Sequence, residues 1–389
     1  MSSFIGSSKE HDLVLNIGSG SVYGAIVEFQ KSAPPKILFT HESRLPLKSN
    51  VAADNLISHM LDALHSVVIG LGRQHKKRIR RAHVVLASPW FSSFSKVLSI
   101  KEQSPFVVTD KTIEKLAVEH INSVSKDVIA SSSSIIEKAL SDIRLNGYET
   151  KEPYGKSAKT LDVSVYASAA PKETNKKIES KIYQVIHPGS ISFHTFPFVA
   201  WNVLRSLFAP KDDFIFVNIG GELSDVFIVR RNSIRAFASF PIGRNHLTRK
   251  AALHFETQPE LASTIVNLYT NDTAETALRE KIKTLVNAFG EEWNHGFLRA
   301  IKEMEATQDY FLPQRAFFVS TPNTSVIFCD IIGKQIPNVT PLSRENLSQF
   351  VGFDSGESPS VPIILEAIYI NGHFSEIETV YKQEQTPVK

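Results

Sequence analysis

One short pattern occurs twice in the chain. Residues 13–27 read LVLNIGSGSVYGAIV, and residues 215–229 read IFVNIGGELSDVFIV. In each copy, three apolar residues lead into Asn-Ile-Gly, a small polar turn and a second apolar run. Asn16 and Asn218 are equivalent and lie 202 residues apart (218 − 16 = 202). This spacing indicates two related halves, each opening on a strand, a turn and a strand, and not a short solenoid repeat.

The residues after each copy follow the same order. A third strand is predicted at residues 36–45 (KILFTHESRL) and at residues 232–243 (NSIRAFASFPIG). Helical periodicity then appears in residues 53–72 and in residues 245–255. This alternation of strands and helices predicts an α/β architecture.

The residues between and after these units predict further elements. A strand is expected at residues 81–89, and a helix is expected to begin at Thr109 or Asp110. Strand, glycine-containing loop, strand and helix are predicted within residues 143–186, which we interpret as a small inserted α/β subdomain. Residues 259–312 are predicted to be largely helical, and residues 315–333 are expected to return to strands.

Composition excludes several classes of protein. The chain has 43 basic and 40 acidic side chains, a balance that does not favour nucleic acid or an anionic membrane as its principal partner. One cysteine, Cys329, excludes an intrachain disulfide and cysteine-rich zinc sites. No apolar run reaches the roughly 20 residues that span a bilayer, and no secretory leader is evident. The basic run Arg73 to Arg81 is either a solvated face or a local anion-binding surface.

The turns of the repeated pattern have the composition of phosphate-binding loops. Backbone N–H groups in such turns can surround an anion, and small residues let the backbone approach it closely. The first turn contains Gly18, Ser19, Gly20 and Ser21, and the second contains Gly220 and Gly221.

The duplicated unit resembles the superfamily of actin, Hsp70 and sugar kinases, and within it the chain resembles FtsA and PilM. The first loop of those proteins is similar to Asn16–Val22 apart from its first residue. Residues 145–172 resemble the inserted subdomain of FtsA. Residues 240–252, FPIGRNHLTRKAA, resemble a further family stretch, with Arg244 in place of a glycine. Together these stretches extend over most of residues 12–330 in the family's order.

The resemblance implies an actin-like (ribonuclease H-like) fold of two halves with duplicated mixed sheets and an inserted small α/β subdomain. It implies four regions: residues 1–80 as the first part of domain 1, residues 81–190 as the inserted subdomain, residues 191–375 as domain 2 with a returning helix, and residues 376–389 as a polar flexible tail.

The resemblance also implies a site for ATP and Mg²⁺ between the halves, with no catalytic residue assigned. Asp225 would hold the metal through a water molecule. The implied nucleotide-binding residues are Asn16, Gly18, Ser19, Gly20, Ser21, Asn218, Gly220, Gly221, Ser224 and Gly243.

The chain departs from the family's pattern at three places in this one site. Asn16 and Asn218 replace aspartates, and asparagine carries no charge and is a poor general base. Glu222 replaces a glycine, where a carboxylate would repel a triphosphate. Residues 320–324 replace a glycine-rich adenosine turn, and Pro322 lacks an amide donor. We therefore predict a retained fold with weak or lost ATP binding, and a chain that is not an active ATPase.

Single residues keep two interpretations at this point. Asn16 and Asn218 either bond neighbouring backbone at the strand ends or keep a nucleotide contact. Asp225 has a structural role in its turn or holds a metal-bound water. Glu222 is predicted to be a solvated loop charge and not a catalytic base, and the aromatic residues of 193–201 are predicted to be core.

By resemblance, the chain is expected to be an FtsA-like cytoplasmic scaffold of bacterial cell division. A PilM-like role in type IV pilus assembly is the alternative, and an active ATPase of the same fold is a further one. The implied partners are other copies of the chain, in filaments or dimers, and a division tubulin homologue or a pilus inner-membrane protein. Nucleic acid is not expected, and membrane contact would be indirect, at the inner face of the membrane through a partner.

Overall fold

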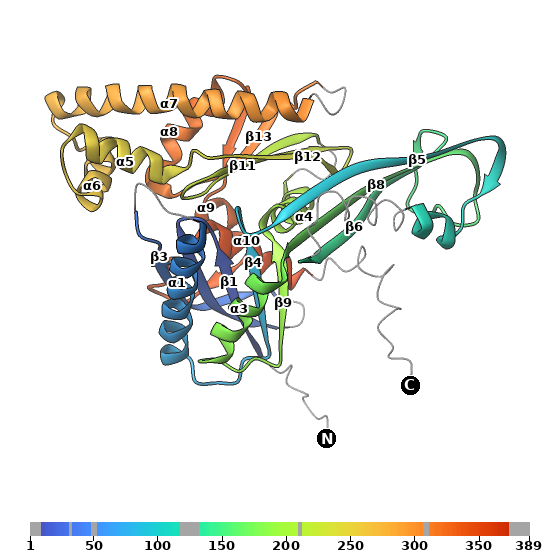
Figure 1. The fold of residues 1–389 in the computed structure, drawn as a ribbon, viewed down its shortest axis with the longest axis horizontal. Helices are drawn as coiled ribbons and strands as arrows, with labels where there is room; N and C mark the ends of the chain where they lie inside the picture. Colours follow the sequence, from blue (N-terminus) through green and yellow to red (C-terminus); the bar gives the residue numbers. More distant parts are fainter. Residues whose placement is uncertain are drawn as a thin grey trace.

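The fold was analysed in a computed structural model, which describes residues 9–30, 33–47, 53–116, 132–208, 212–305 and 311–372. The predicted tail, residues 376–389, lies outside these ranges. Three sheets and the helices that cover them account for the described part of the chain (Figure 1).

The first sheet is mixed and begins with the first copy of the repeated pattern. β1, β2 and β3 form an antiparallel meander, and β4 and β9 extend it in parallel on the other side of β1. Across the sheet the strands are β15 (Gly352–Phe353), β3 (Lys36–Arg44), β2 (Ser21–Phe29), β1 (Glu10–Ile17), β4 (Arg81–Leu86) and β9 (Ser190–Thr195).

The second sheet repeats this topology. β10, β11 and β12 form the meander, and β13 runs parallel to β10 as β4 does to β1. Asn16 pairs with Tyr23 in the first meander, and Asn218 pairs with Asp225 in the second, in the same register. Across the sheet the strands are β12 (Ser233–Phe240), β11 (Ser224–Arg230), β10 (Phe214–Ile219), β13 (Arg315–Val319) and β14 (Asn338–Pro341). The predicted duplication and the mixed α/β fold are confirmed.

Helices cover the outer faces of both sheets. α1 (Ala53–Gln74) and α3 (Lys172–Tyr183) pack on the first sheet. The outer face of the second sheet is covered by α5 (Arg244–His254), α6 (Pro259–Thr270), α7 (Thr276–Glu305) and α8 (Pro322–Gly333). Apart from α8, these helices form where the sequence predicts helical structure.

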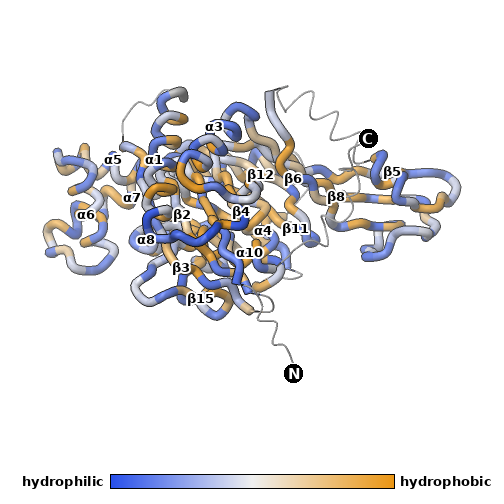
Figure 2. Tube along the Cα trace, turned by 90° about the horizontal axis from the view of Figure 1, so that it is seen from below, coloured by the Kyte–Doolittle hydropathy of each residue, from blue (hydrophilic) through white to orange (hydrophobic). Residues whose placement is uncertain are grey.

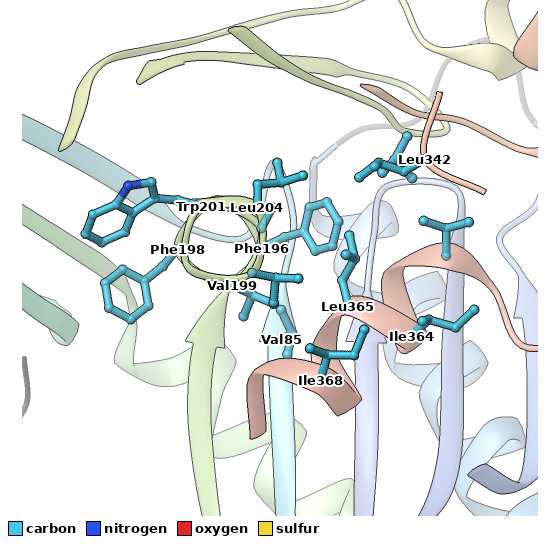
Figure 3. Close-up of a cluster of buried hydrophobic side chains, with 14 of the residues drawn as sticks. Val85, Phe196, Phe198, Val199, Trp201, Leu204, Leu342, Ile364, Leu365 and Ile368 are labelled. Carbon is cyan, nitrogen blue, oxygen red and sulfur yellow. The ribbon is translucent and has the colours of Figure 1, made fainter. Parts of the chain in front are cut away.

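Two further helices lie between the sheets and join their inner faces. α4 (Phe196–Leu207) and α10 (Val361–Asn371) share one core with β1, β2, β10 and β11. Figure 3 shows their side chains in this layer, including Phe196 and Leu204 of α4 and Leu365 of α10. Figure 2 shows the apolar segments gathered in this middle part of the molecule. The expected returning helix is α10. Of the four aromatic residues predicted to be core, Phe196, Phe198 and Trp201 are buried, whereas Phe193 is only half-buried.

The third sheet contains the inserted strands and projects to one side in Figure 1. Its order is β5 (Ser92–Val107), β8 (Ser157–Pro171), β6 (Ser133–Leu145) and β7 (Tyr148–Glu149). The expected boundaries at residues 81 and 190 differ from this arrangement, because β4 and β9 are strands of the first sheet and α3 packs beside α1. The inserted sheet itself begins at Ser92 and ends at Pro171.

One predicted element is wrong. Residues 315–333 were expected to be strands throughout, but only β13 is a strand, and the residues that follow form α8. Pro322 stands in the first turn of α8, where its missing N–H group has no intrahelical acceptor to lose. The short helices α9 (Arg344–Leu347) and η1 (Ser348–Phe350) complete the second half.

Candidate functional site

A cavity of about 520 Å³ lies between the two halves, where both turns of the repeated pattern meet. It is lined by the two turns, by the residues after β4 and β13, and by residues 341–345 and 358–362. Of the predicted nucleotide-site residues, those that line it are Asn16, Gly18, Ser19, Gly20, Ser21, Asn218, Gly220, Gly221 and Asp225.

Two predicted residues do not line the cavity. Ser224 is fully buried: its hydroxyl donates to the carbonyl of Ile242 at 2.7 Å and accepts from the indole N–H of Trp293 at 3.0 Å. Gly243 lies behind the second turn, where a Cβ atom would be 2.3 Å from the carbonyl oxygen of Gly221. Both residues support the second turn from the side of its own domain.

The two turns touch each other directly. A methyl group on Gly20 would lie 2.7 Å from Cα of Gly221, and one on Gly221 would lie 2.3 Å from Cα of Gly20. The N–H of Glu222 also donates to Oγ of Ser19 at 3.0 Å. Gly20 and Gly221 are therefore in contact, and the space between these two residues is too narrow for even a methyl group.

Each turn also uses its own amides internally. The N–H of Gly18 donates to the carbonyl of Ser21 at 3.0 Å, and the N–H of Gly220 donates to the carbonyl of Leu223 at 2.9 Å. These two bonds are equivalent in the duplicated halves and close both turns in the same way.

The prediction that Glu222 is a solvated charge is wrong. Its carboxylate accepts two hydrogen bonds from Arg249, at 2.7 and 2.9 Å, and one from the amide of Asn245 at 2.8 Å. Burial favours the neutral acid, but these donors outweigh it and hold the pKa of Glu222 below its usual value. Arg249 and Asn245 both belong to α5, so Glu222 fastens the second turn to this helix and does not face a ligand as a free charge.

Asn16 lines the cavity, but the hydrogen bond of its side-chain amide goes to a residue of α10. Its amide Nδ2 donates to Oε1 of Glu366 on α10 at 2.6 Å. Glu366 is fully buried, and burial raises its pKa well above the usual value despite this hydrogen bond. An aspartate at position 16 would place a second carboxyl group against this buried acid.

Asn218 has the same relation to Asp225. Its Nδ2 donates to Oδ2 of Asp225 at 3.3 Å, and the hydroxyl of Ser239 donates to Oδ1 at 2.7 Å. The side chain of Ser88, on the other half, also bonds Asp225 and lies 3.2 Å from Oγ of Ser239. Burial raises the pKa of Asp225, although these three bonds oppose the shift. Protein donors thus occupy the carboxylate that was expected to hold a metal-bound water.

Arg244 adds a contact across the cavity. It is the first residue of α5, and its Nη2 donates to Oγ of Ser21 on the other half at 3.3 Å. The guanidinium is therefore a link between the two halves.

The predicted adenosine turn is the beginning of a helix. Residues 320–323 line the cavity and lead into α8, and Oγ of Ser320 lies 2.7 Å from Oγ1 of Thr324. This geometry agrees with the expectation that Pro322 rules out a glycine-rich turn.

The described residues hold no group of three or more His, Cys, Asp or Glu side chains that could bind a metal ion. Within the same residues, no helix is both long and apolar enough to cross a membrane. In the basic run, Arg80 pairs with Glu10 and Asp12, and Arg81 pairs with Asp12 at 3.4 Å. The last residues of the run therefore connect the starts of the inner strands β1 and β4.

Solved structures of other proteins identify the fold of this chain. No protein-family model and no curated protein sequence match the chain. Among solved structures, PilM in the PilM–PilN type IV pilus biogenesis complex matches with a TM-score of 0.60 at 15% identity, over 92% of this chain and 96% of that one. EutJ, an ethanolamine utilization protein from Carboxydothermus hydrogenoformans, matches with a TM-score of 0.46 at 13% identity, over 93% and 89%.

The chain therefore has the actin-like ATPase fold, as the duplicated pattern indicated. Within this class, the chain is similar to PilM over nearly the whole length of both proteins.

Contact between the turns predicts the effect of adding a methyl group at Gly221. The variant Gly221→Ala should lower the free energy of unfolding by about 1–3 kcal/mol, because the backbone of Gly20 has to move. Chemical denaturation measures this change. Gly333→Ala is the matched control, since nothing lies within 4 Å of the added methyl group at the end of α8. Equal stabilities for the two variants would contradict the contact.

Burial of Glu366 predicts a pH dependence. Its folded-state pKa is raised, so the folded chain binds the proton more tightly, and this contribution is lost as pH rises above the unfolded value of about 4.3. Glu366→Gln keeps the acceptor for Asn16 and removes the titration. Its stability relative to the unsubstituted chain should rise by up to about 1.4 kcal/mol per pH unit between pH 5 and pH 8. Urea unfolding of both proteins at pH 5 and at pH 8 measures this change. The same stability difference between the two proteins at both pH values would contradict the prediction.

Proposed function

We propose that the chain is a PilM-like scaffold protein, which binds a membrane-bound partner in type IV pilus assembly and does not hydrolyse ATP. The observation that carries the proposal is the match to PilM over 92% of this chain and 96% of that one. Because the match extends through all three sheets, it includes the inserted sheet as well as the two halves. We prefer this role to the FtsA-like one because PilM is the solved structure that the chain matches with a TM-score of 0.60.

The geometry of the cleft supports a role without catalysis. The turns contact each other at Gly20 and Gly221, and the carboxylates of Glu222 and Asp225 are engaged by protein donors. A scaffold needs a fixed surface and no cycle of nucleotide binding and release. We therefore propose that ATP and Mg²⁺ bind weakly or not at all.

A groove on the inserted sheet offers a place for the partner. It lies between the start of β6 and α3. Its walls combine the apolar residues Ile135, Ile136 and Phe193 with the polar and charged residues Ser134, Lys172, Asn175, Lys176 and Glu179. The side chain of Ile135 is 36% exposed, which is unusual for an isoleucine in a strand. Within the described residues, Oδ1 of Asn175 is buried there and accepts no hydrogen bond. A short segment that carries both apolar and charged side chains fits this lining.

The proposal gives the chain a location and a set of partners. It would lie in the cytoplasm at the inner face of the membrane, held there by a PilN-like protein. The division tubulin homologue expected of an FtsA-like protein, and self-association into filaments or dimers, are the alternatives that a binding experiment separates.

We expect the chain to bind the PilN homologue of its own organism. Ile135→Asp should weaken this binding by on the order of tenfold or more, because a charged group would replace the exposed apolar side chain that contacts the partner. Tyr148→Asp is the matched control: this side chain is 81% exposed at the hairpin of the inserted sheet, and binding should be unchanged. Biolayer interferometry measures the affinity of the unsubstituted chain and of both variants for the PilN homologue.

Binding to the division tubulin homologue, with no binding to the PilN homologue, would contradict the PilM-like role. Equal losses from Ile135→Asp and Tyr148→Asp would contradict the groove as the docking place.

A further inference from the structure

The inserted sheet touches the second half as well as the first. Three of its strands meet β12, the edge strand of the second sheet. The hydroxyl of Ser95 on β5 donates to the carbonyl of Ile234, and Oγ of Ser141 on β6 lies 2.9 Å from Oγ of Ser233. The connection therefore links parts of the chain that are more than 90 residues apart.

A buried arginine is at the centre of this contact. Arg235 of β12 is 5% exposed, and it donates to the carboxylate of Asp142 on β6 and to Oγ of Ser164 on β8 at 2.6 Å. Asp142 also accepts from Nε of Arg144 at 2.8 Å. Breaking such a buried ion pair is strongly destabilising, because removal of one partner leaves the other charge buried and uncompensated.

The backbone of β6 is shaped for this contact. The register between β6 and β8 shifts between Ser141 and Ile143, and Asp142 between them has a φ angle of 47°, in the left-handed region. An extra residue of this kind leaves the ladder and changes the direction of its side chain. Aspartate is among the few residues that adopt this conformation readily.

The same strand is fastened to the first half. Five residues before Asp142, the carboxylate of Glu137 accepts from the backbone N–H of Thr195 on β9 at 3.0 Å, and from Ser168 on β8 at 2.7 Å. The hydroxyl of Tyr166 lies 3.1 Å from Oγ1 of Thr195. Residues 137–142 of β6 thus contact β9 of the first half and β12 of the second half through buried side chains.

We propose that the inserted sheet is a clasp, which fixes the two halves in one relative orientation whether or not a ligand is in the cleft. The clasp is separate from the contact between the turns, since it lies on β12 and not on the turn residues. The clasp adds to the contact between the turns and to the shared core of α4 and α10. Contacts at separate places oppose rotation of the halves better than one, because a single contact can act as a pivot. This proposal does not depend on the identity of the partner.

Distance measurements between spin labels test the clasp. The labels are attached to cysteines at Ser58 on α1 and Gln258 before α6, two exposed positions on different halves, in a Cys329→Ser background. We expect one narrow distance distribution in the full chain, unchanged by ATP with Mg²⁺. Arg235→Gln should broaden the distribution and add longer distances. A distribution that Arg235→Gln leaves unchanged would overturn the proposal, as would a shift of the unsubstituted chain on adding ATP with Mg²⁺.

Arg315→Gln is the matched control. It removes another arginine of the second half, whose ion pair with Asp212 is exposed and does not reach the inserted sheet. It should give the parent distribution, and equal broadening would overturn the proposal. If circular dichroism shows that Arg235→Gln does not fold, the pair Ser141→Ala and Ser164→Ala removes two neutral contacts of the clasp. That variant should broaden the distribution, and no change would count against the clasp.

Discussion

Direct contact between the two turns, at Gly20 and Gly221, is the constraint on which the rest of the site depends. The duplicated halves bring equivalent turns face to face, and glycine on both sides lets them meet without a gap. Other features of the site follow from this closed arrangement. Glu222 turns to Arg249 on its own half, and Arg244 reaches Ser21 on the other.

The paired asparagines have a shared physical reason. Asn16 donates to buried Glu366, and Asn218 donates to buried Asp225. An aspartate at either position would put two carboxyl groups within hydrogen-bond distance in a buried place, and one of them would have to take up a proton. Each asparagine therefore acts as a hydrogen-bond donor to a buried acid.

Local patterns in the sequence predicted the fold well. The repeated Asn-Ile-Gly unit, the strands around it and the helical periodicity of α1 and α5 are confirmed, because they depend on residues close together in the chain. Contacts between distant residues could not be read in this way. In the sequence, Glu366 is a single charge in an apolar segment, and it lies 350 residues from its partner Asn16. Arg249, the partner of Glu222, is one of several basic residues in its segment. A charge inside the apolar run of α10 was the one available signal. The stretch that became α8 was misjudged because its apolar residues suit a strand as well as a short helix.

Calorimetric titration of the chain with ATP, with and without Mg²⁺, tests the central claim that the two turns close on each other and leave no place for a triphosphate between them. The contact between the turns, the engaged carboxylates of Glu222 and Asp225, and the buried pair of Asn16 and Glu366 predict no saturable binding up to millimolar ATP under either condition. Micromolar binding that requires Mg²⁺ would contradict the account, because it needs both an open gap between the turns and a free carboxylate.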